Sequence, residues 1–121
     1  MSAHPPRRSH EPVVWLLFAA GGMVAAMLLP ALILIIGLAG PTGLLSEGVL
    51  EYDRVLGLID GPVGKLVVFS VVSLLFWHAM HRIFHGLHDL GIETRGNAYR
   101  FLCYGFALLA TLVTAGIVLI L

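Results

Sequence analysis

The chain has 121 residues, of which 59% are hydrophobic and 12% are charged, and its formal net charge is +0. A water-soluble domain carries about 25% charged residues, so this composition excludes an ordinary soluble fold and indicates a protein surrounded by lipid. The length allows a single domain, and a net charge of zero gives no reason to expect a nucleic-acid partner. Cys103 is the single cysteine, which excludes an internal disulfide and a thiolate metal cage and is typical of a small buried residue in a membrane helix.

Residues 1–12 form a polar, proline-bearing tail, and the membrane anchor is expected at 13–121. No charge occurs in 13–40. A transmembrane helix needs about 20 apolar residues and a signal-peptide core only about 7–15, so we expect a retained first span at 13–40. Pro30 removes a backbone hydrogen bond from this span and predicts a kink. Close packing of another helix is expected at the small residues Gly21, Gly22, Ala25 and Ala26.

The segment 41–61 differs from its surroundings because it is rich in charge. Its charged residues are Glu47, Glu51, Asp53, Arg54 and Asp60. Its apolar residues recur at helical spacing and are Leu45, Val49, Tyr52, Val55, Leu56 and Ile59. This pattern is typical of a short amphipathic helix that lies in the membrane interface and does not cross the membrane.

The second and third spans are expected at 63–88 and 97–121. Pro62 can open the second helix, and Lys65 near its start can extend an ammonium group to the lipid headgroups. Asn97 is a favourable cap for the last helix. The sequence therefore predicts an all-α membrane protein with three transmembrane helices and a short interfacial helix in the first loop.

Basic residues flank the spans unequally. With the N-terminus inside the cell, the cytoplasmic side holds Arg7, Arg8, Arg82, Arg95 and Arg100, against Arg54 and Lys65 outside. Short loops rich in Lys and Arg remain on the cytoplasmic side of a membrane. We therefore expect a multi-pass protein with a cytoplasmic N-terminus and an extracytoplasmic C-terminus.

A polar stripe interrupts the end of the second span. Its members, His78, His81, Arg82, His85, His88 and Asp89, recur at helical spacing and share a face of roughly 120°. Polar groups at membrane depth are costly and usually face a cavity or a protein partner. For His88 and Asp89, contact with lipid headgroups is the simpler interpretation. Trp15 and Trp77 are typical of the aromatic belt at the membrane interface.

A quinone site is the first functional interpretation of this polar stripe. A quinone head needs a slot near the interface, donors for its oxygens and a path for protons. Arginine is a permanently charged donor, and histidine both donates and titrates near neutral pH. With a cytoplasmic N-terminus, Trp15 lies at the depth of the polar stripe and can pack against the quinone ring.

Haem and metal binding are the alternatives. Two axial histidines must approach the iron of a b-type haem from opposite sides, and all histidines within these spans lie on one helix, so a partner chain would have to supply the other ligand. A zinc site has three or four protein ligands, often including a carboxylate, and Asp89 is the only carboxylate near these histidines in the sequence. We therefore expect no metal site in this chain.

Three segments are specific beyond hydropathy: EPVVWLLFAAGGM, YDRVL and WHAMHRIFHGLHDLGI. In order and over essentially the whole chain, they resemble the D subunit of the bacterial quinol:fumarate reductase that has two small anchor subunits. The resemblance implies a hetero-oligomer of anaerobic respiration in the bacterial cytoplasmic membrane. In that family a flavoprotein with FAD reduces fumarate, an iron–sulfur protein relays electrons, and the two anchor subunits bind menaquinol.

The resemblance also implies site residues. The wall of the menaquinol pocket that this chain supplies would be lined by Trp15, Phe18, His81, Arg82 and His85, with Trp77, His78 and His88 as secondary candidates. The acidic group that deprotonates the quinol would come from the other anchor subunit, so this chain alone would have no catalytic residue. Members of this type lack haem.

The chain departs from that family at two positions. Relatives carry histidine where this chain has Phe84, and His78 stands where they have a nonpolar or small residue. The histidine pattern is therefore shifted around the helix. Two alternatives stay open: a haem-b-binding anchor of succinate dehydrogenase, and a structural packing protein whose partners bind the quinone alone.

Overall fold

The computed structural model describes residues 11–92 and 98–121, and this part of the chain is helical with no strand. Its elements are α1 (Glu11–Leu32), the π-helix η1 (Ile33–Ala39), α2 (Tyr52–Ile59), α3 (Pro62–Asp89) and α4 (Ala98–Ile120). The helices long and apolar enough to cross a membrane number 3: Trp15–Ala39, Pro62–Asp89 and Ala98–Ile120. The predicted fold class is confirmed, with α2 as the short helix between the first two spans.

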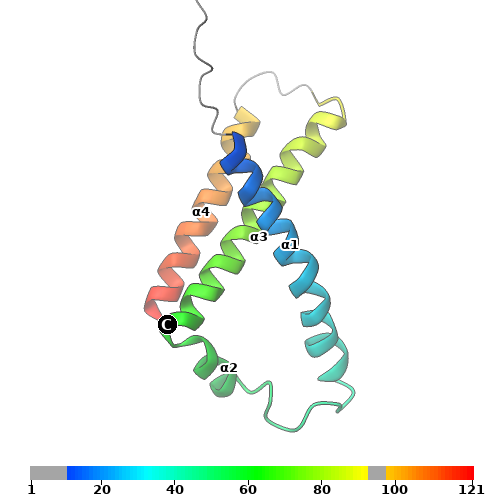
Figure 1. Cartoon of the computed structure of the whole chain (residues 1–121), viewed down its shortest axis with the longest axis vertical. Helices are drawn as coiled ribbons and strands as arrows, with labels where there is room; N and C mark the ends of the chain where they lie inside the picture. Colours follow the sequence, from blue (N-terminus) through cyan, green and yellow to red (C-terminus); the bar gives the residue numbers. More distant parts are fainter. Residues whose placement is uncertain (1–10, 93–97) are drawn as a thin grey trace, which may run out of the picture.

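Helix α3 is the centre of the molecule. It packs against α4 on one side and against α1 on the other, and in the described part of the chain the backbones of α1 and α4 do not come close to each other. Figure 1 shows α1 crossing α3 near the end of the bundle where α1 begins, after which the two helices diverge. Groups at the end of α3 near this crossing therefore meet both other spans.

Two glycines make the crossing of α1 and α3 possible. Gly21 is buried, and a methyl group in place of its hydrogen would overlap the carbonyl oxygen of Leu74 and lie 2.8 Å from Cβ of His78. A methyl group on Gly22 would lie 2.8 Å from Cε1 of His78. This confirms the close approach predicted at the two glycines, since a side chain on Gly21 would meet the backbone of α3 and one on Gly22 would displace the His78 ring.

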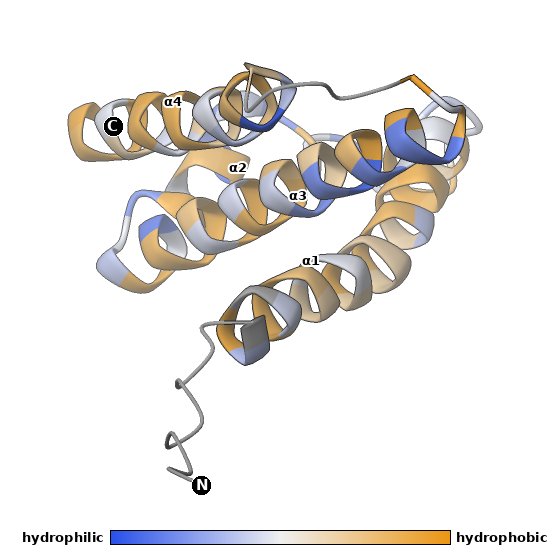
Figure 2. Cartoon of the chain, turned by 90° about the horizontal axis from the view of Figure 1, so that it is seen from above, coloured by the Kyte–Doolittle hydropathy of each residue, from blue (hydrophilic) through white to orange (hydrophobic). Residues whose placement is uncertain are grey.

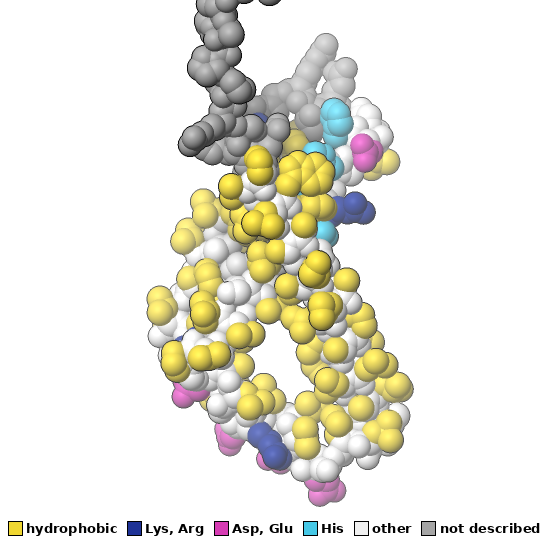
Figure 3. Space-filling view, in the orientation of Figure 1, with side chains coloured by type: hydrophobic (Ala, Val, Ile, Leu, Met, Phe, Trp, Pro, Cys, Tyr) yellow, Lys and Arg dark blue, Asp and Glu magenta, His cyan; other side chains and the backbone are white. Residues whose placement is uncertain are grey.

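The first span changes its helical geometry just after Pro30. Helix α1 runs through Pro30 to Leu32, and η1 then follows as a π-helix, in which the Gly40 N–H donates to the carbonyl of Ile35 at 2.9 Å. Among the described elements, η1 contacts only α1. Figure 3 shows an opening between this far half of the first span and the rest of the chain, bordered mostly by hydrophobic side chains.

The helix in the first loop is shorter than the apolar pattern suggests. Leu45 and Val49 precede α2, which begins at Tyr52. Gly43 and Gly48 have φ angles of +73° and +81°, a left-handed backbone conformation that interrupts a right-handed helix and that glycine adopts without strain. The periodic pattern therefore extends further than the helix.

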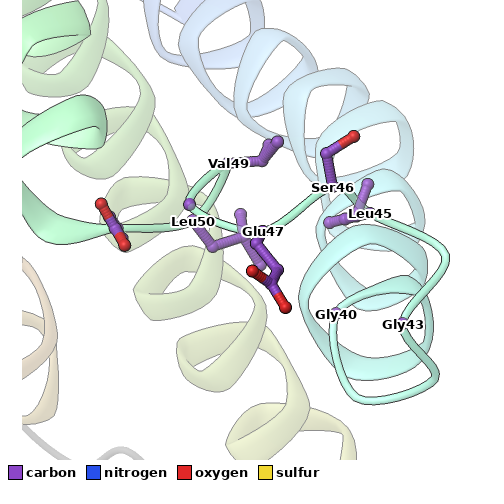
Figure 4. A pocket seen from close by; sticks show the side chains of 9 residues that line it. Gly40, Gly43, Leu45, Ser46, Glu47, Val49 and Leu50 are labelled. Atoms are coloured by element: carbon purple, nitrogen blue, oxygen red, sulfur yellow. The ribbon is translucent and has the colours of Figure 1, made fainter.

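The turn before α2 holds a depression at the end of the bundle remote from the α1–α3 crossing. Its volume is about 360 Å³, and Figure 4 shows Leu45, Ser46 and Glu47 among its lining residues. At the start of α3, Lys65 forms an ion pair with Asp60 at 3.5 Å, so its ammonium group has a partner within the chain. The depression contains none of the predicted site residues.

The chain buries very little of its own apolar surface. Among the described residues, only Cys103, Ala107 and Val118 are buried hydrophobic side chains, and all three lie on α4. Large apolar side chains such as Leu16 and Leu119 are 71% and 83% exposed. Figure 3 shows hydrophobic side chains covering the middle of the visible face, with charged and histidine side chains near its two ends. The protein is therefore built to be covered by lipid or by other proteins.

Candidate functional site

The polar end of α3 lies where α3 meets both other spans. Figure 2 shows hydrophilic residues concentrated toward this end of the helix, while its other half is largely apolar. Helix α3 continues unbroken through the polar stripe to Asp89. Because the helix does not end where its apolar part ends, the polar side chains are held at fixed angles around one axis.

His78 is directed toward α1. Its Nδ1 lies 2.9 Å from the carbonyl oxygen of Phe18, and its ring stacks on the Phe18 ring with 4.5 Å between centroids and 11° between planes. A carbonyl oxygen only accepts hydrogen bonds, so Nδ1 of His78 donates. The absence of a side chain on Gly22 leaves room for this ring.

His81 is directed toward α4. Its Nδ1 lies 2.8 Å from the hydroxyl oxygen of Tyr104. Its ring also lies 4.6 Å from the Phe18 ring and 4.3 Å from the His85 ring. His81 therefore connects all three spans through one side chain.

Predicted site residues from two helices form one cluster of aromatic and imidazole rings. We call it the ring cluster, and its members are Trp15, Phe18, His78, His81 and His85. Trp15 joins it edge-on, with its centroid 6.2 Å from that of Phe18, and its side chain is 66% exposed. The cluster therefore has a packed inner part and an open outer edge.

The other members of the polar stripe remain at the surface of the isolated chain. Arg82, His85, His88 and Asp89 are exposed, and Arg82 forms no hydrogen bond or ion pair with a described residue. A face of roughly 120° is wider than one helix–helix contact, so α1 and α4 cover only part of the polar stripe. The polar stripe thus has two parts: His78 and His81 face the neighbouring helices, and Arg82, His85, His88 and Asp89 face outward.

A small cavity lies beside the ring cluster. It is lined by Leu17, Phe18, Trp77, His81 and Tyr104 and has a volume of about 40 Å³. That space holds a water molecule or two, whereas pockets for organic ligands occupy about 300–1,000 Å³. A quinone head does not fit in this cavity, so a quinone site beside the described part of the ring cluster would need further walls.

Trp77 has its polar atom engaged within the bundle. Its Nε1–H donates to the hydroxyl of Thr111 at 3.1 Å, and that hydroxyl donates to the carbonyl of Ala107 at 2.8 Å. The tryptophan therefore joins α3 to α4, while its ring also borders the small cavity.

The sequence reasoning missed Tyr104 and Thr111 on α4. A signal was present, because small and polar residues recur at helical spacing through an otherwise apolar span. These residues are Cys103, Tyr104, Ala107, Thr111 and Thr114. In a membrane helix such residues mark the side that packs on a neighbour.

In the described ranges, no group of three or more His, Cys, Asp or Glu residues is placed to hold a metal ion.

The family model and the similar proteins that match this chain all name the same subunit. The family model for the D subunit of fumarate reductase matches residues 5–119. The D subunit of fumarate reductase from Aliivibrio salmonicida (strain LFI1238) is 45% identical over 109 residues, which cover 90% of this chain and 90% of that protein. The corresponding protein of Vibrio cholerae serotype O1 (strain M66-2) is 44% identical over 102 residues, covering 84% of this chain and 78% of the relative.

A third relative is matched over a longer stretch. The D subunit of fumarate reductase from Haemophilus ducreyi (strain 35000HP / ATCC 700724) is 40% identical over 113 residues, or 93% of each chain. The family match at residues 5–119 runs through all three apolar helices and the polar end of α3. The chain therefore belongs to the family of fumarate reductase D subunits, which are membrane anchors.

Proposed function

We propose that this chain anchors a quinol:fumarate reductase on the cytoplasmic face of the membrane and supplies one wall of its menaquinol site. Its partners are a second anchor subunit, an iron–sulfur subunit that relays electrons, and the flavoprotein that reduces fumarate. The family and the extensive exposed apolar surface support an anchor role, because such a surface needs lipid or companion helices.

The ring cluster is the observation that carries the quinol-binding proposal. It offers flat faces next to hydrogen-bonding groups at the polar end of the bundle, and Arg82 lies exposed close by on the same helix. Flat apolar faces with a few polar groups that fix orientation are what a quinone head requires. The small volume beside the cluster is consistent with a pocket completed by another protein.

The chemistry divides between this chain and its partners. Oxidation of a quinol to a quinone releases two protons and two electrons, and the electrons pass to the iron–sulfur protein. Arg82 donates a charge-assisted hydrogen bond to a quinol oxygen, and His81 donates a second one. Trp15 and Phe18 pack beside the ring. The proton acceptor is an acidic group of the second anchor subunit, so this chain binds and orients the quinol but does not deprotonate it.

The proposed orientation of the chain in the membrane rests on the positions of its basic residues. We place the N-terminus and the polar end of α3 on the cytoplasmic side, where the partner proteins dock, and the C-terminus on the opposite side. Arg82 and Arg100 lie at the cytoplasmic end, while Arg54 and Lys65 lie near α2 at the other end. Retention of basic residues on the cytoplasmic side supports this arrangement.

The test is the substitution Arg82→Leu in the assembled complex. Loss of a charge-assisted hydrogen bond of about 1.5–3 kcal/mol should lower menaquinol oxidation by about 10- to 100-fold. Fumarate reduction from a soluble dye should stay unchanged, because that reaction does not use the membrane site. Arg54→Leu, at an exposed arginine on α2, is the matched control and should leave both rates unchanged.

Two outcomes would count against the proposal. Unchanged quinol turnover in the Arg82→Leu complex would remove the binding role and leave only a packing role. A b-type absorption band in the reduced, purified complex would point instead to a haem-carrying anchor of the succinate dehydrogenase kind.

A further inference from the structure

The direction of the hydrogen bond between Tyr104 and His81 can be argued from the partners that each atom has. The Tyr104 hydroxyl and Nδ1 of His81 are 2.8 Å apart, and either atom could in principle donate. Within the residues that the structure describes, that hydroxyl forms no other hydrogen bond. A half-buried O–H without an acceptor is unfavourable, so the hydroxyl donates and Nδ1 accepts. The hydrogen of the neutral His81 ring is then on Nε2.

His78 has the opposite arrangement. Its Nδ1 donates to the carbonyl of Phe18, so a neutral His78 ring has its hydrogen on Nδ1 and a lone pair on Nε2. Both imidazoles pack on the same Phe18 ring, at centroid distances of 4.5 and 4.6 Å. With this assignment, two neighbouring histidines on α3 adopt different tautomers, His78 through its bond to α1 and His81 through its bond to α4.

The tautomer of His81 matters because quinol oxidation changes the character of the quinol oxygens. Each oxygen loses a proton and becomes an acceptor only, so the group that stabilises the product side must donate. An imidazole with hydrogen on Nε2 donates there and cannot take a proton at that atom. Tyr104 and His81 both line the small cavity beside the ring cluster, so the hydrogen bond that sets the His81 tautomer lies at the proposed site.

We propose that Tyr104 is a positioning residue for quinol oxidation: its hydroxyl holds the His81 ring in place with Nε2–H presented to a quinol oxygen. This inference rests on the proposed menaquinol site and adds to it a residue from α4. Tyr104 does not touch the quinol itself. It acts through His81, because its hydroxyl fixes both the orientation of that ring and the side that donates.

The first experiment replaces Tyr104 by phenylalanine in the assembled complex. Tyr104→Phe keeps the ring and removes the hydroxyl, so the kcat for oxidation of a menaquinol analogue should fall by about 10-fold. The KM should change little, because the lost interaction matters most as the oxygen loses its proton. Rates are expressed per bound flavin, so that a lower yield of complex does not imitate a lower rate. Tyr99→Phe, at an exposed tyrosine on α4, is the matched control and should behave as wild type.

The second experiment tests whether Tyr104 acts through His81. The amide of His81→Gln donates without help from a tyrosine, so this variant should keep part of the quinol activity, and adding Tyr104→Phe to it should cause no further loss. A full 10-fold loss in that background, or a wild-type kcat for Tyr104→Phe alone, would overturn the inference. The Arg82→Leu complex separates the two ideas, because a slow Arg82→Leu with a normal Tyr104→Phe removes only the positioning role.

Discussion

At the scale of single residues, Gly22 and His78 form a complementary pair. The ring of His78 occupies the space that a side chain at position 22 would fill, and it uses that space to reach the carbonyl of Phe18. A larger residue at 22 would therefore remove a hydrogen bond and a stacking contact together. The two positions should tolerate change only in combination.

We predict that Gly22→Val disrupts the crossing of α1 and α3. Overpacking of this kind costs about 1–3 kcal/mol, so the amount of assembled complex in membranes, measured as flavin bound to them, should decrease. Gly37→Val is the control, because a methyl group there meets only Cγ2 of Ile33, at 3.9 Å. Adding His78→Ala should restore assembly of the Gly22→Val variant. Equal assembly of the Gly22→Val and Gly37→Val complexes would contradict the packing argument.

At the scale of the elements, α3 and α4 are joined by side-chain hydrogen bonds along their contact. Trp77 of α3 donates to Thr111 of α4, and His81 of α3 is hydrogen-bonded to Tyr104 of α4. Polar bonds between membrane helices are individually modest. Their fixed geometry nevertheless sets the rotation of α3 relative to α4, and that rotation decides which part of the polar stripe is covered.

We predict that Thr111→Val weakens this contact slightly but measurably. Loss of the acceptor for the Trp77 N–H should cost about 0.6 kcal/mol, the average for such bonds in membranes. The midpoint for thermal loss of quinol-linked activity should fall, while Thr111→Ser, which keeps a hydroxyl, should stay close to wild type. Equal midpoints for the valine and serine variants would show that the bond adds no stability.

Long apolar runs made the spans predictable from sequence, since a membrane of fixed thickness imposes a minimum length on each. The extent of α2 was less predictable, because the left-handed conformation of Gly48 is not visible in an apolar pattern. Membership of the polar stripe was also readable from spacing. Its division between α1, α4 and the surface was not, because that depends on where the neighbouring helices lie. Spacing did mark the side of the last span on which Tyr104 lies, but its partner His81 depends on how that helix meets α3.

At the scale of the whole molecule, orientation in the membrane is open to a direct measurement. The single cysteine, Cys103, is buried, so a Cys103→Ala background allows labelling of introduced cysteines. In intact cells with a permeable outer membrane, Ser46→Cys should react with a membrane-impermeant maleimide. Leu90→Cys, at a side chain that is 77% exposed, should react only after the inner membrane is opened. The reverse pattern would invert the proposed topology.

The opening beside η1 has a consequence for how this chain exists before assembly. Because the backbone of η1 comes close only to α1 among the described elements, the far ends of the first two spans are linked in that part of the chain only through the segment 40–61. A newly inserted copy without companions therefore leaves that spacing to the surrounding acyl chains. We expect companion helices in the complex to cover this opening and to fix the spacing, so that the finished geometry is a property of the assembly.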